Sequence, residues 1–116
     1  MTGIEWLIET FGSPETALRS ETSLRILFES IVTDMGLKPV GPPVWHQFPD
    51  TGGFTGIWLL QESHLTIHTF PEFRSACLNV FCCSTRPGLD WQTRLHELLG
   101  ATEVQVREFH RLYDRR

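Results

Sequence analysis

Residues 54–70 read FTGIWLLQESHLTIHTF and predict two consecutive β-strands. The segments Phe54–Leu60 and Leu65–Phe70 are rich in β-branched and aromatic residues, which pack well on the surface of a sheet. The DTGG sequence at residues 50–53 is typical of a turn before the first of them. A further strand is predicted over Cys77–Cys83, with one face formed by Leu78, Val80 and Cys82. The middle of the chain is therefore expected to form several strands of a sheet.

The N-terminal half is expected to add one strand and one helix. Trp6–Phe11 is predicted to be a strand that ends at Gly12-Ser13-Pro14. A helix ending before Gly36 is predicted because apolar residues recur at helical spacing, namely Leu24, Leu27, Phe28, Ile31 and Met35. The prolines between Lys38 and Phe48 exclude helix, so this segment is expected to be extended.

The C-terminal part is expected to add a second helix and a last strand. The helix is predicted from Trp91 to Leu99, with Asp90 at its start and Gly100 at its end. The strand Thr102–Phe109 alternates, so two of its side chains are expected to point inward, Val104 and Val106. This order of elements predicts an α+β fold, a two-layer sandwich with a mostly antiparallel sheet and two helices on one face. The length of 116 residues fits a single domain over residues 1–116.

Composition narrows the class of protein. The net charge is −4 with both signs mixed along the chain, so we expect no nucleic-acid partner. The first residues lack the pattern of a signal peptide, and no apolar run has the length of a membrane span. The three cysteines, Cys77, Cys82 and Cys83, are an odd number, bunched together, and are expected to be reduced thiols. We therefore expect a cytoplasmic protein without a membrane partner.

The string ESHLTIHTFPE at residues 62–72, followed by Cys83, resembles the self-processing motif of the small prokaryotic S-adenosylmethionine decarboxylases. The resemblance implies that Ser63 attacks the carbonyl of Glu62 and that the chain is cut between these two residues. Ser63 would then become a pyruvoyl group, the cofactor for decarboxylation of a small-molecule substrate. Such an enzyme needs neither a metal ion nor pyridoxal phosphate.

The resemblance also implies a role for several other residues. Thr55 and His68 match the hydroxyl residue and the histidine that assist processing. Cys83 matches the cysteine that returns a proton to the substrate. Glu72 matches the carboxylate that holds the ribose, and Phe48 matches an aromatic residue that stacks on adenine.

Each of these residues also has an ordinary structural interpretation. Ser63 and His64 fit a hairpin turn, His68 fits a core histidine, and Cys83 fits a small buried residue. Together, at the family's spacing, they favour function. A zinc site formed by His64 and His68 is rejected because four residues of strand span about 13 Å.

The spacing of Ser63 and His68 bears on assembly. They are five residues apart, so a regular strand would place them on opposite faces. Either a turn intervenes at Ser63, or the histidine comes from a second copy. The family resemblance implies a homodimer with shared sites, in which Ser63 and Cys83 come from one protomer. On that pattern the other protomer supplies Thr55, His68 and Glu72.

The chain departs from the family pattern in ways that leave its substrate open. Gly3-Ile4-Glu5 stands where the family has Gly-x-His, and the family's aspartate, tryptophan and glycine are replaced by Asn79, Phe70 and Ser84. The first expectation is S-adenosylmethionine, decarboxylated for spermidine and polyamine biosynthesis. Arginine or ornithine as the substrate is one alternative. An unprocessed, non-catalytic homologue that acts as a binding partner is another.

Overall fold

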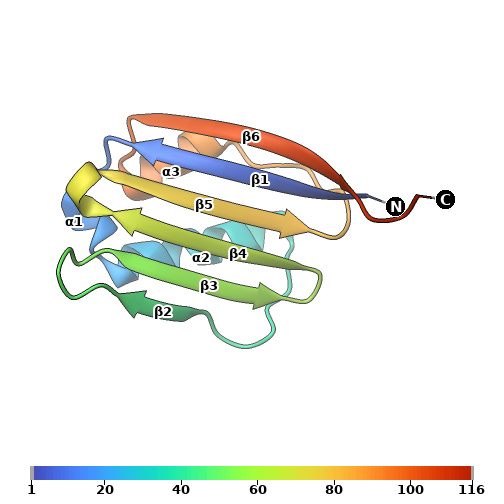
Figure 1. The fold of residues 1–116 in the computed structure, drawn as a ribbon, viewed down its shortest axis with the longest axis horizontal. Coiled ribbons are helices and arrows are strands. Elements are labelled where there is room, and N and C mark those ends of the chain that lie inside the picture. Colours follow the sequence, from blue (N-terminus) through green and yellow to red (C-terminus); the bar gives the residue numbers. More distant parts are fainter. Residues whose placement is uncertain (1, 116) are drawn as a thin grey trace.

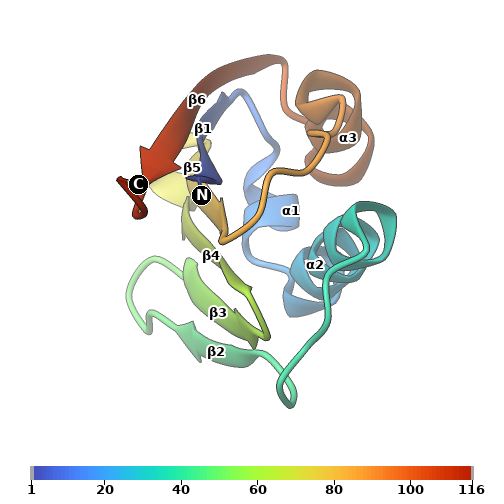
Figure 2. The ribbon, with the colours of Figure 1, turned by 90° about the vertical axis from the view of Figure 1, so that its right-hand side faces the viewer.

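The computed structural model describes residues 2–115 and contains one six-stranded antiparallel sheet with its helices on a single face (Figures 1 and 2). The strands are β1 (Thr2–Phe11), β2 (Val44–Gln47), β3 (Phe54–Leu60), β4 (Ser63–Phe70), β5 (Ser75–Cys82) and β6 (Glu103–Leu112). The helices are α1 (Glu15–Leu18), α2 (Glu21–Met35) and α3 (Trp91–Leu99), with a short 3₁₀ helix η1 (Pro71–Phe73) between β4 and β5.

The strand order across the sheet is β2-β3-β4-β5-β1-β6. The β3–β4 and β4–β5 hairpins join neighbouring strands, and their register places Thr55 opposite His68 and Ser63 opposite Cys82. The N-terminal strand β1 inserts between β5 and β6; it pairs with β6 along its whole length and with β5 from Ile4 to Phe11. The sheet is therefore assembled from both ends of the sequence.

The core lies between the sheet and its helices. Alternate residues of β1 and β4 are buried, including Trp6, Leu65 and Ile67, as the period of two in a strand requires. The apolar stripe of α2 packs on them and includes Phe28, whose ring lies 4.7 Å from that of Trp45 between centroids. Burial of these side chains supplies the main driving force for the fold.

The ends of the two long helices follow from local chemistry. The Ser20 hydroxyl accepts a hydrogen bond from the backbone N–H of Ser23 at the start of α2. Asp90 accepts one from the backbone N–H of Thr93 at the start of α3. Gly36 and Gly100 end α2 and α3 in the left-handed conformation, which glycine adopts without steric cost.

The predicted α+β two-layer sandwich is confirmed, with several differences in detail, among them an earlier start of β1 at Thr2 and a later end of β6 at Leu112. A one-turn helix, α1, lies on the same side as α2 and α3 (Figure 2), and its four residues are too few for a periodic pattern. Strand β4 begins at Ser63, two residues earlier than expected. Val106 shares the helix-facing register with Ile8, as expected, but it is 39% exposed because it lies on the edge strand of the sheet.

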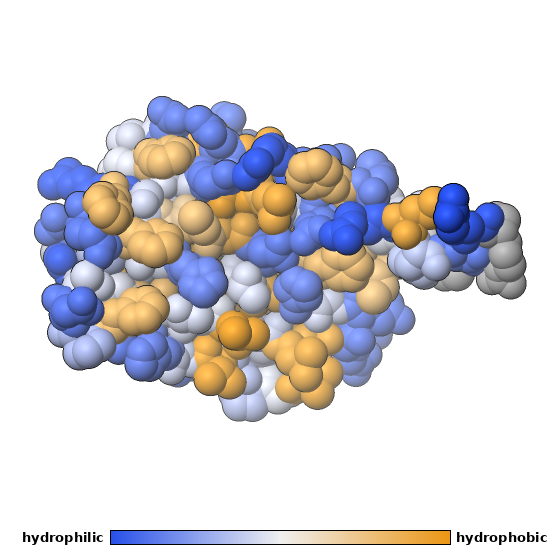
Figure 3. All heavy atoms as spheres, in the orientation of Figure 1, coloured by the Kyte–Doolittle hydropathy of each residue, from blue (hydrophilic) through white to orange (hydrophobic). Residues whose placement is uncertain are grey.

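The face of the sheet opposite the helices has no covering layer within residues 2–115 (Figure 2). Figure 3 shows apolar side chains interspersed with polar ones on this side. By register, the exposed apolar residues of this bare face include Phe11, Val44, Ile57, Leu59 and Phe109. None of the helices in residues 2–115 combines the length and hydropathy that a membrane span requires.

Candidate processing and active site

Ser63 lies at the start of β4, directly after the two-residue turn Gln61–Glu62. It pairs with Leu60 on one side and with Cys82 on the other. The alternation of β4 places Ser63 on the helix-covered side together with Leu65, and it is half-buried. The bond between Glu62 and Ser63 is therefore held at the junction of a turn and an ordered strand.

Cys83 is joined to this bond by a backbone contact. Its N–H donates a hydrogen bond to the carbonyl oxygen of Glu62 at 2.8 Å. The Cys83 carbonyl in turn accepts a hydrogen bond from the Tyr113 hydroxyl at 2.6 Å, so the end of β6 is tied to the same place. The structure thus brings together three predicted site residues, Glu62, Ser63 and Cys83.

The neighbouring Cys82 has a different environment. Its side chain is 1% exposed and belongs to the core, whereas Cys83 is exposed. Burial raises the pKa of the Cys82 thiol, although the positive charge of Arg86 partly opposes this rise. A buried neutral thiol is unreactive, so of the two adjacent cysteines only Cys83 is accessible.

A second group of predicted residues lies on the bare face. The Thr55 hydroxyl and Nδ1 of His68 are 3.0 Å apart and share a hydrogen bond between β3 and β4. His46 lies opposite Thr55 on β2, and Cys77 lies opposite His68 on β5. Burial, and then the nearby Glu9 carboxylate, raise the pKa of Cys77. A shallow cavity of about 300 Å³ is lined by His68 and Cys77.

Phe48 and Glu72 lie near this second group. Phe48 precedes the turn between β2 and β3, where its N–H donates to the Gly53 carbonyl at 2.7 Å. Its ring meets that of His46 edge-on, with centroids 5.3 Å apart. Glu72 is exposed in η1, which follows β4 at the end remote from Ser63.

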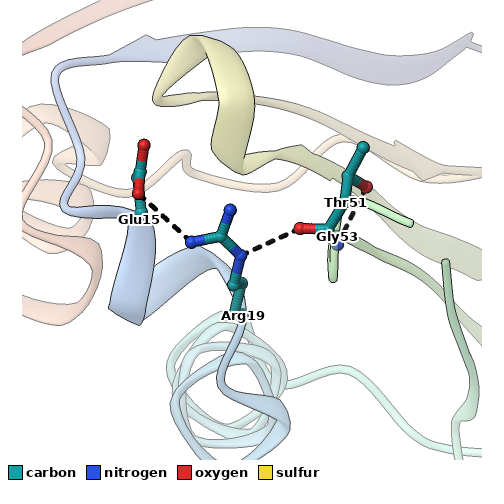
Figure 4. Close-up of polar contacts among 4 residues, drawn as sticks. All are labelled: Glu15, Arg19, Thr51 and Gly53. Carbon is teal, nitrogen blue, oxygen red and sulfur yellow. Dashed lines mark hydrogen bonds and ion pairs between the residues drawn. The ribbon is translucent and has the colours of Figure 1, made fainter. Parts of the chain in front are cut away.

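Arg19 supports the β2–β3 turn from the end of α1 (Figure 4). Its Nε donates to the carbonyl of Thr51 at 2.8 Å, and its guanidinium also contacts Glu15 at 3.2 Å. The Thr51 hydroxyl accepts from the Gly53 N–H at 3.2 Å. These contacts fix the turn that leads from Phe48 to Thr55. Sequence reasoning missed Arg19, because no local pattern links it to residues more than thirty positions away.

Ser63 and His68 do not meet within one chain. The turn precedes Ser63, so the alternative in which a turn intervenes at Ser63 is wrong. The two side chains project from opposite faces of a regular strand, and five residues of strand span about 16 Å. The Ser63 group and the His68 group are therefore separate within a protomer.

A further polar network crosses the bare face, and sequence reasoning did not find it. Nε2 of His64 lies 2.8 Å from Oδ1 of Asn79, and Nδ2 of Asn79 donates to Glu5 at 2.8 Å. Glu5 also pairs with Arg111 of β6. The bond from Asn79 and the contacts with Arg111 hold the pKa of the Glu5 carboxyl below its usual range. Glu5 and Asn79, two of the departures from the family pattern, thus contact each other.

No three His, Cys, Asp or Glu side chains within residues 2–115 are arranged to share a metal ion. The cysteines in this part of the chain are free thiols. The candidate site residues come from the β2–β3 turn, β3, β4, η1 and the residues that precede β4 and follow β5.

The fold and the sequence both have counterparts among known proteins. A crystal structure of the adenosylmethionine decarboxylase from Aquifex aeolicus superposes with a TM-score of 0.81 at 23% identity, covering 98% of this chain and 94% of that one. The S-adenosylmethionine decarboxylase proenzyme of Archaeoglobus fulgidus is 36% identical over 72% of each sequence. That of Caldicellulosiruptor saccharolyticus is 33% identical over 90% of this chain and 84% of its own length.

The fold and these relatives define the class of protein as a carboxy-lyase of the pyruvoyl-dependent type. The sequence pattern of the S-adenosylmethionine decarboxylase family matches residues 4–112, nearly the whole chain. The chain belongs to the S-adenosylmethionine decarboxylase family.

Proposed function

We propose that this protein cuts itself between Glu62 and Ser63 and then decarboxylates S-adenosylmethionine for spermidine biosynthesis. The observation that carries the proposal is the hydrogen bond from the Cys83 N–H to the Glu62 carbonyl oxygen at 2.8 Å. This donor is aimed at the oxygen on which negative charge develops when Ser63 attacks. Preorganised donors of this kind are a large source of rate enhancement in acyl transfer.

The first step is a transfer of the Glu62 acyl group from nitrogen to oxygen. Ser63 Oγ attacks the Glu62 carbonyl carbon, the peptide C–N bond breaks, and an ester with a free amine forms. Loss of the α-proton of residue 63 then breaks its Cβ–Oγ bond and releases the carboxylate of Glu62. The dehydroalanine that remains tautomerises to an imine, and water converts the imine to a pyruvoyl group with loss of ammonia. The fragments are residues 1–62 and 63–116.

Thr55 and His68 fit the role of the proton-handling pair. The hydrogen bond between the Thr55 hydroxyl and Nδ1 fixes the orientation of the imidazole ring. Nε2 is then left for transfer of the α-proton. Their place on the exposed bare face is accessible to a partner.

The pyruvoyl group at position 63 supplies an electron sink for loss of CO₂ when it has formed. Cys83, whose thiol is exposed and whose N–H contacts Glu62, is proposed to return a proton to the substrate. Glu72 and Phe48 are proposed to hold the ribose and the adenine of S-adenosylmethionine. Metal ions and pyridoxal phosphate have no role in this proposal.

The site is proposed to form between two copies of the chain. Because Ser63 and His68 are on opposite faces, one protomer supplies Ser63 and Cys83, and the other supplies Thr55, His68 and Glu72. The bare face carries exposed apolar residues such as Ile57 and Leu59, which association would remove from water. We further propose that this homodimer works in the cytoplasm, where its free thiols remain reduced, and that it binds neither nucleic acid nor membranes.

Intact mass spectrometry of the purified protein tests self-cleavage. The wild type is expected to give two fragments with a pyruvoyl group at the start of the second. Ser63→Ala removes the nucleophile and is expected to remain a single inactive chain. A Ser63→Ala protein that still separates into the same fragments would contradict the proposal.

Decarboxylation assays then test the substrate. Release of CO₂ is compared for S-adenosylmethionine, arginine and ornithine with the processed protein. Activity on S-adenosylmethionine alone supports the proposed reaction. Activity on arginine or ornithine would assign the site to another amino acid, and an uncut wild type without activity would indicate a non-catalytic homologue.

A further inference from the structure

A small pocket lies beside the bond between Glu62 and Ser63, on the side of the sheet that the helices cover. Its volume is about 100 Å³, and its walls are Leu37, Lys38, Gln61, Glu62, Ser63 and Arg86. Because one water molecule takes up about 30 Å³, a carboxylate group with one or two waters fits this space. The pocket thus joins the proposed cleavage bond to two cationic residues.

Lys38 is held at the pocket by its backbone. Its carbonyl accepts a hydrogen bond from the Gln61 N–H at 2.8 Å, one residue before Glu62. The chain then continues along β3, where the Val40 N–H donates to the Leu59 carbonyl at 3.0 Å. Lys38 is the only lysine in the sequence. Its position beside the turn is therefore fixed by the same hydrogen bonds that order the turn.

Arg86 reaches the pocket from the loop after β5. Its guanidinium donates to the Met35 carbonyl at 3.1 Å, at the C-terminal end of α2. Its charge lowers the pKa of Cys82, against the effect of burial, and Cys82 is the residue that pairs with Ser63. The positive charge thus acts on the direct strand partner of Ser63. Neither Arg86 nor Lys38 has a carboxylate within ion-pair distance among residues 2–115.

We propose that Lys38 and Arg86 form an anion site that receives the α-carboxylate of Glu62 released by self-cleavage. This inference rests on the proposed self-processing. When the ester collapses, the α-proton of residue 63 goes to the base and the electrons of its Cβ–Oγ bond stay on Oγ. That oxygen leaves as part of the Glu62 carboxylate, so a second negative charge appears beside the one on the Glu62 side chain.

The charges in the pocket match the products better than the starting chain. Before cleavage Glu62 contributes one carboxylate, and afterwards it contributes two, next to two cations. Stabilisation of the leaving carboxylate accelerates elimination but not the preceding attack by Ser63. The two cations are therefore expected to act on the second step of processing, in which the ester is consumed.

The test follows processing of freshly purified precursor and traps the ester with hydroxylamine. Hydroxylamine cleaves an ester at Ser63 and leaves a serine at the start of the second fragment, whereas normal processing leaves a pyruvoyl group. The variants are Lys38→Met, Lys38→Arg and Arg86→Gln. Glutamine keeps N–H donors for the Met35 carbonyl while removing the charge. Arg25→Gln, near the other end of α2, is the matched control.

Lys38→Met and Arg86→Gln are each expected to slow the formation of the pyruvoyl fragment by roughly tenfold and to accumulate the trapped ester. Lys38→Arg and Arg25→Gln are expected to process at the wild-type rate. If both neutral variants process normally, or slow down without accumulating ester, the inference is wrong. If Arg86→Gln does not fold by circular dichroism, Lys38→Met decides alone. A wild type that stays whole overturns the proposed self-processing itself.

Discussion

At the scale of single residues, position 83 joins two functions through two different atoms. Its N–H contacts the carbonyl of the proposed cleavage bond, while its exposed side chain carries the thiol. A substitution of the side chain leaves the backbone contact available. The proposed donor for self-cleavage and the proposed thiol for decarboxylation are therefore separable by mutation, although they belong to one residue.

Cys83→Ala is expected to process but to lose decarboxylation by at least about 100-fold, as is typical when a general acid is removed. Cys82→Ala is expected to retain activity and to lose on the order of 1 kcal/mol of stability, because it leaves a small cavity in the core. Rates of CO₂ release and denaturant midpoints distinguish the two effects. The reverse pattern would mean that Cys82 is the catalytic thiol.

Glu5 is expected to make stability depend on pH. Hydrogen bonds from Asn79 and then from Arg111 lower its folded-state pKa below the usual 4.5. Its contribution is therefore present above about pH 4.5 and is lost as pH falls through the lower folded value. Glu5→Gln is expected to be less stable at neutral pH and to show a smaller loss on acidification. Urea midpoints at several pH values measure this, and parallel curves for the two proteins would contradict it.

At the scale of elements, the packing of Trp45 explains why residue 56, in the middle of β3, is a glycine. A Cβ at this position would lie 2.2 Å from the ring of Trp45, which packs across it from β2. Gly56→Ala is expected to cost about 1–3 kcal/mol through overpacking. Calorimetry should show a lowered Tm. Trp45→Leu in the same chain should recover part of the loss, and an unchanged Tm in Gly56→Ala would show that the ring moves aside freely.

Elements with strong local signals were predicted closely from the sequence. β3 was predicted with its exact ends, and the last residues of α2 and α3 were predicted because Gly36 and Gly100 leave the helical conformation there. β4 was predicted to begin too late because Ser63 and His64 are polar. Their strand conformation comes from pairing with Cys82 and Phe81, partners that β-propensity alone does not reveal.

Some features of the candidate site could likewise be predicted from the sequence, and others could not. Ser63 and His68 are five residues apart, so their positions on opposite faces of a regular strand could be predicted from the sequence. The proximity of Lys38 and Arg86 to Glu62 was not predictable, because their loops approach the turn only once the sheet and α2 have packed. The contact between Tyr113 and Cys83 likewise joins residues thirty positions apart.

At the scale of the whole molecule, Ser63 and His68 are separate within one chain, so the proposed dimer must bring Ser63 of one protomer to His68 of the other. Co-expression of Ser63→Ala with His68→Ala is expected to restore on the order of a quarter of wild-type activity. About half of randomly assembled dimers are mixed, and each mixed dimer has one intact site. The quarter is measured on the unfractionated dimers, and the mixed species isolated with two affinity tags is expected to have about half of the wild-type activity. No recovery in a verified mixed dimer would place the complete site within one chain.

The strand order has a consequence for the protein if it is cut between Glu62 and Ser63 as proposed. β1 of the first fragment lies between β5 and β6 of the second, and β3 lies against β4, so three of the five strand contacts join different fragments. The precursor folds as one molecule, at a rate independent of its concentration. Once denatured, the processed protein has to recover through an encounter between two molecules, and that recovery slows with dilution. Under the proposed cleavage, folding is therefore expected to be complete before the chain is cut, because the separated fragments would regain the structure only by finding each other.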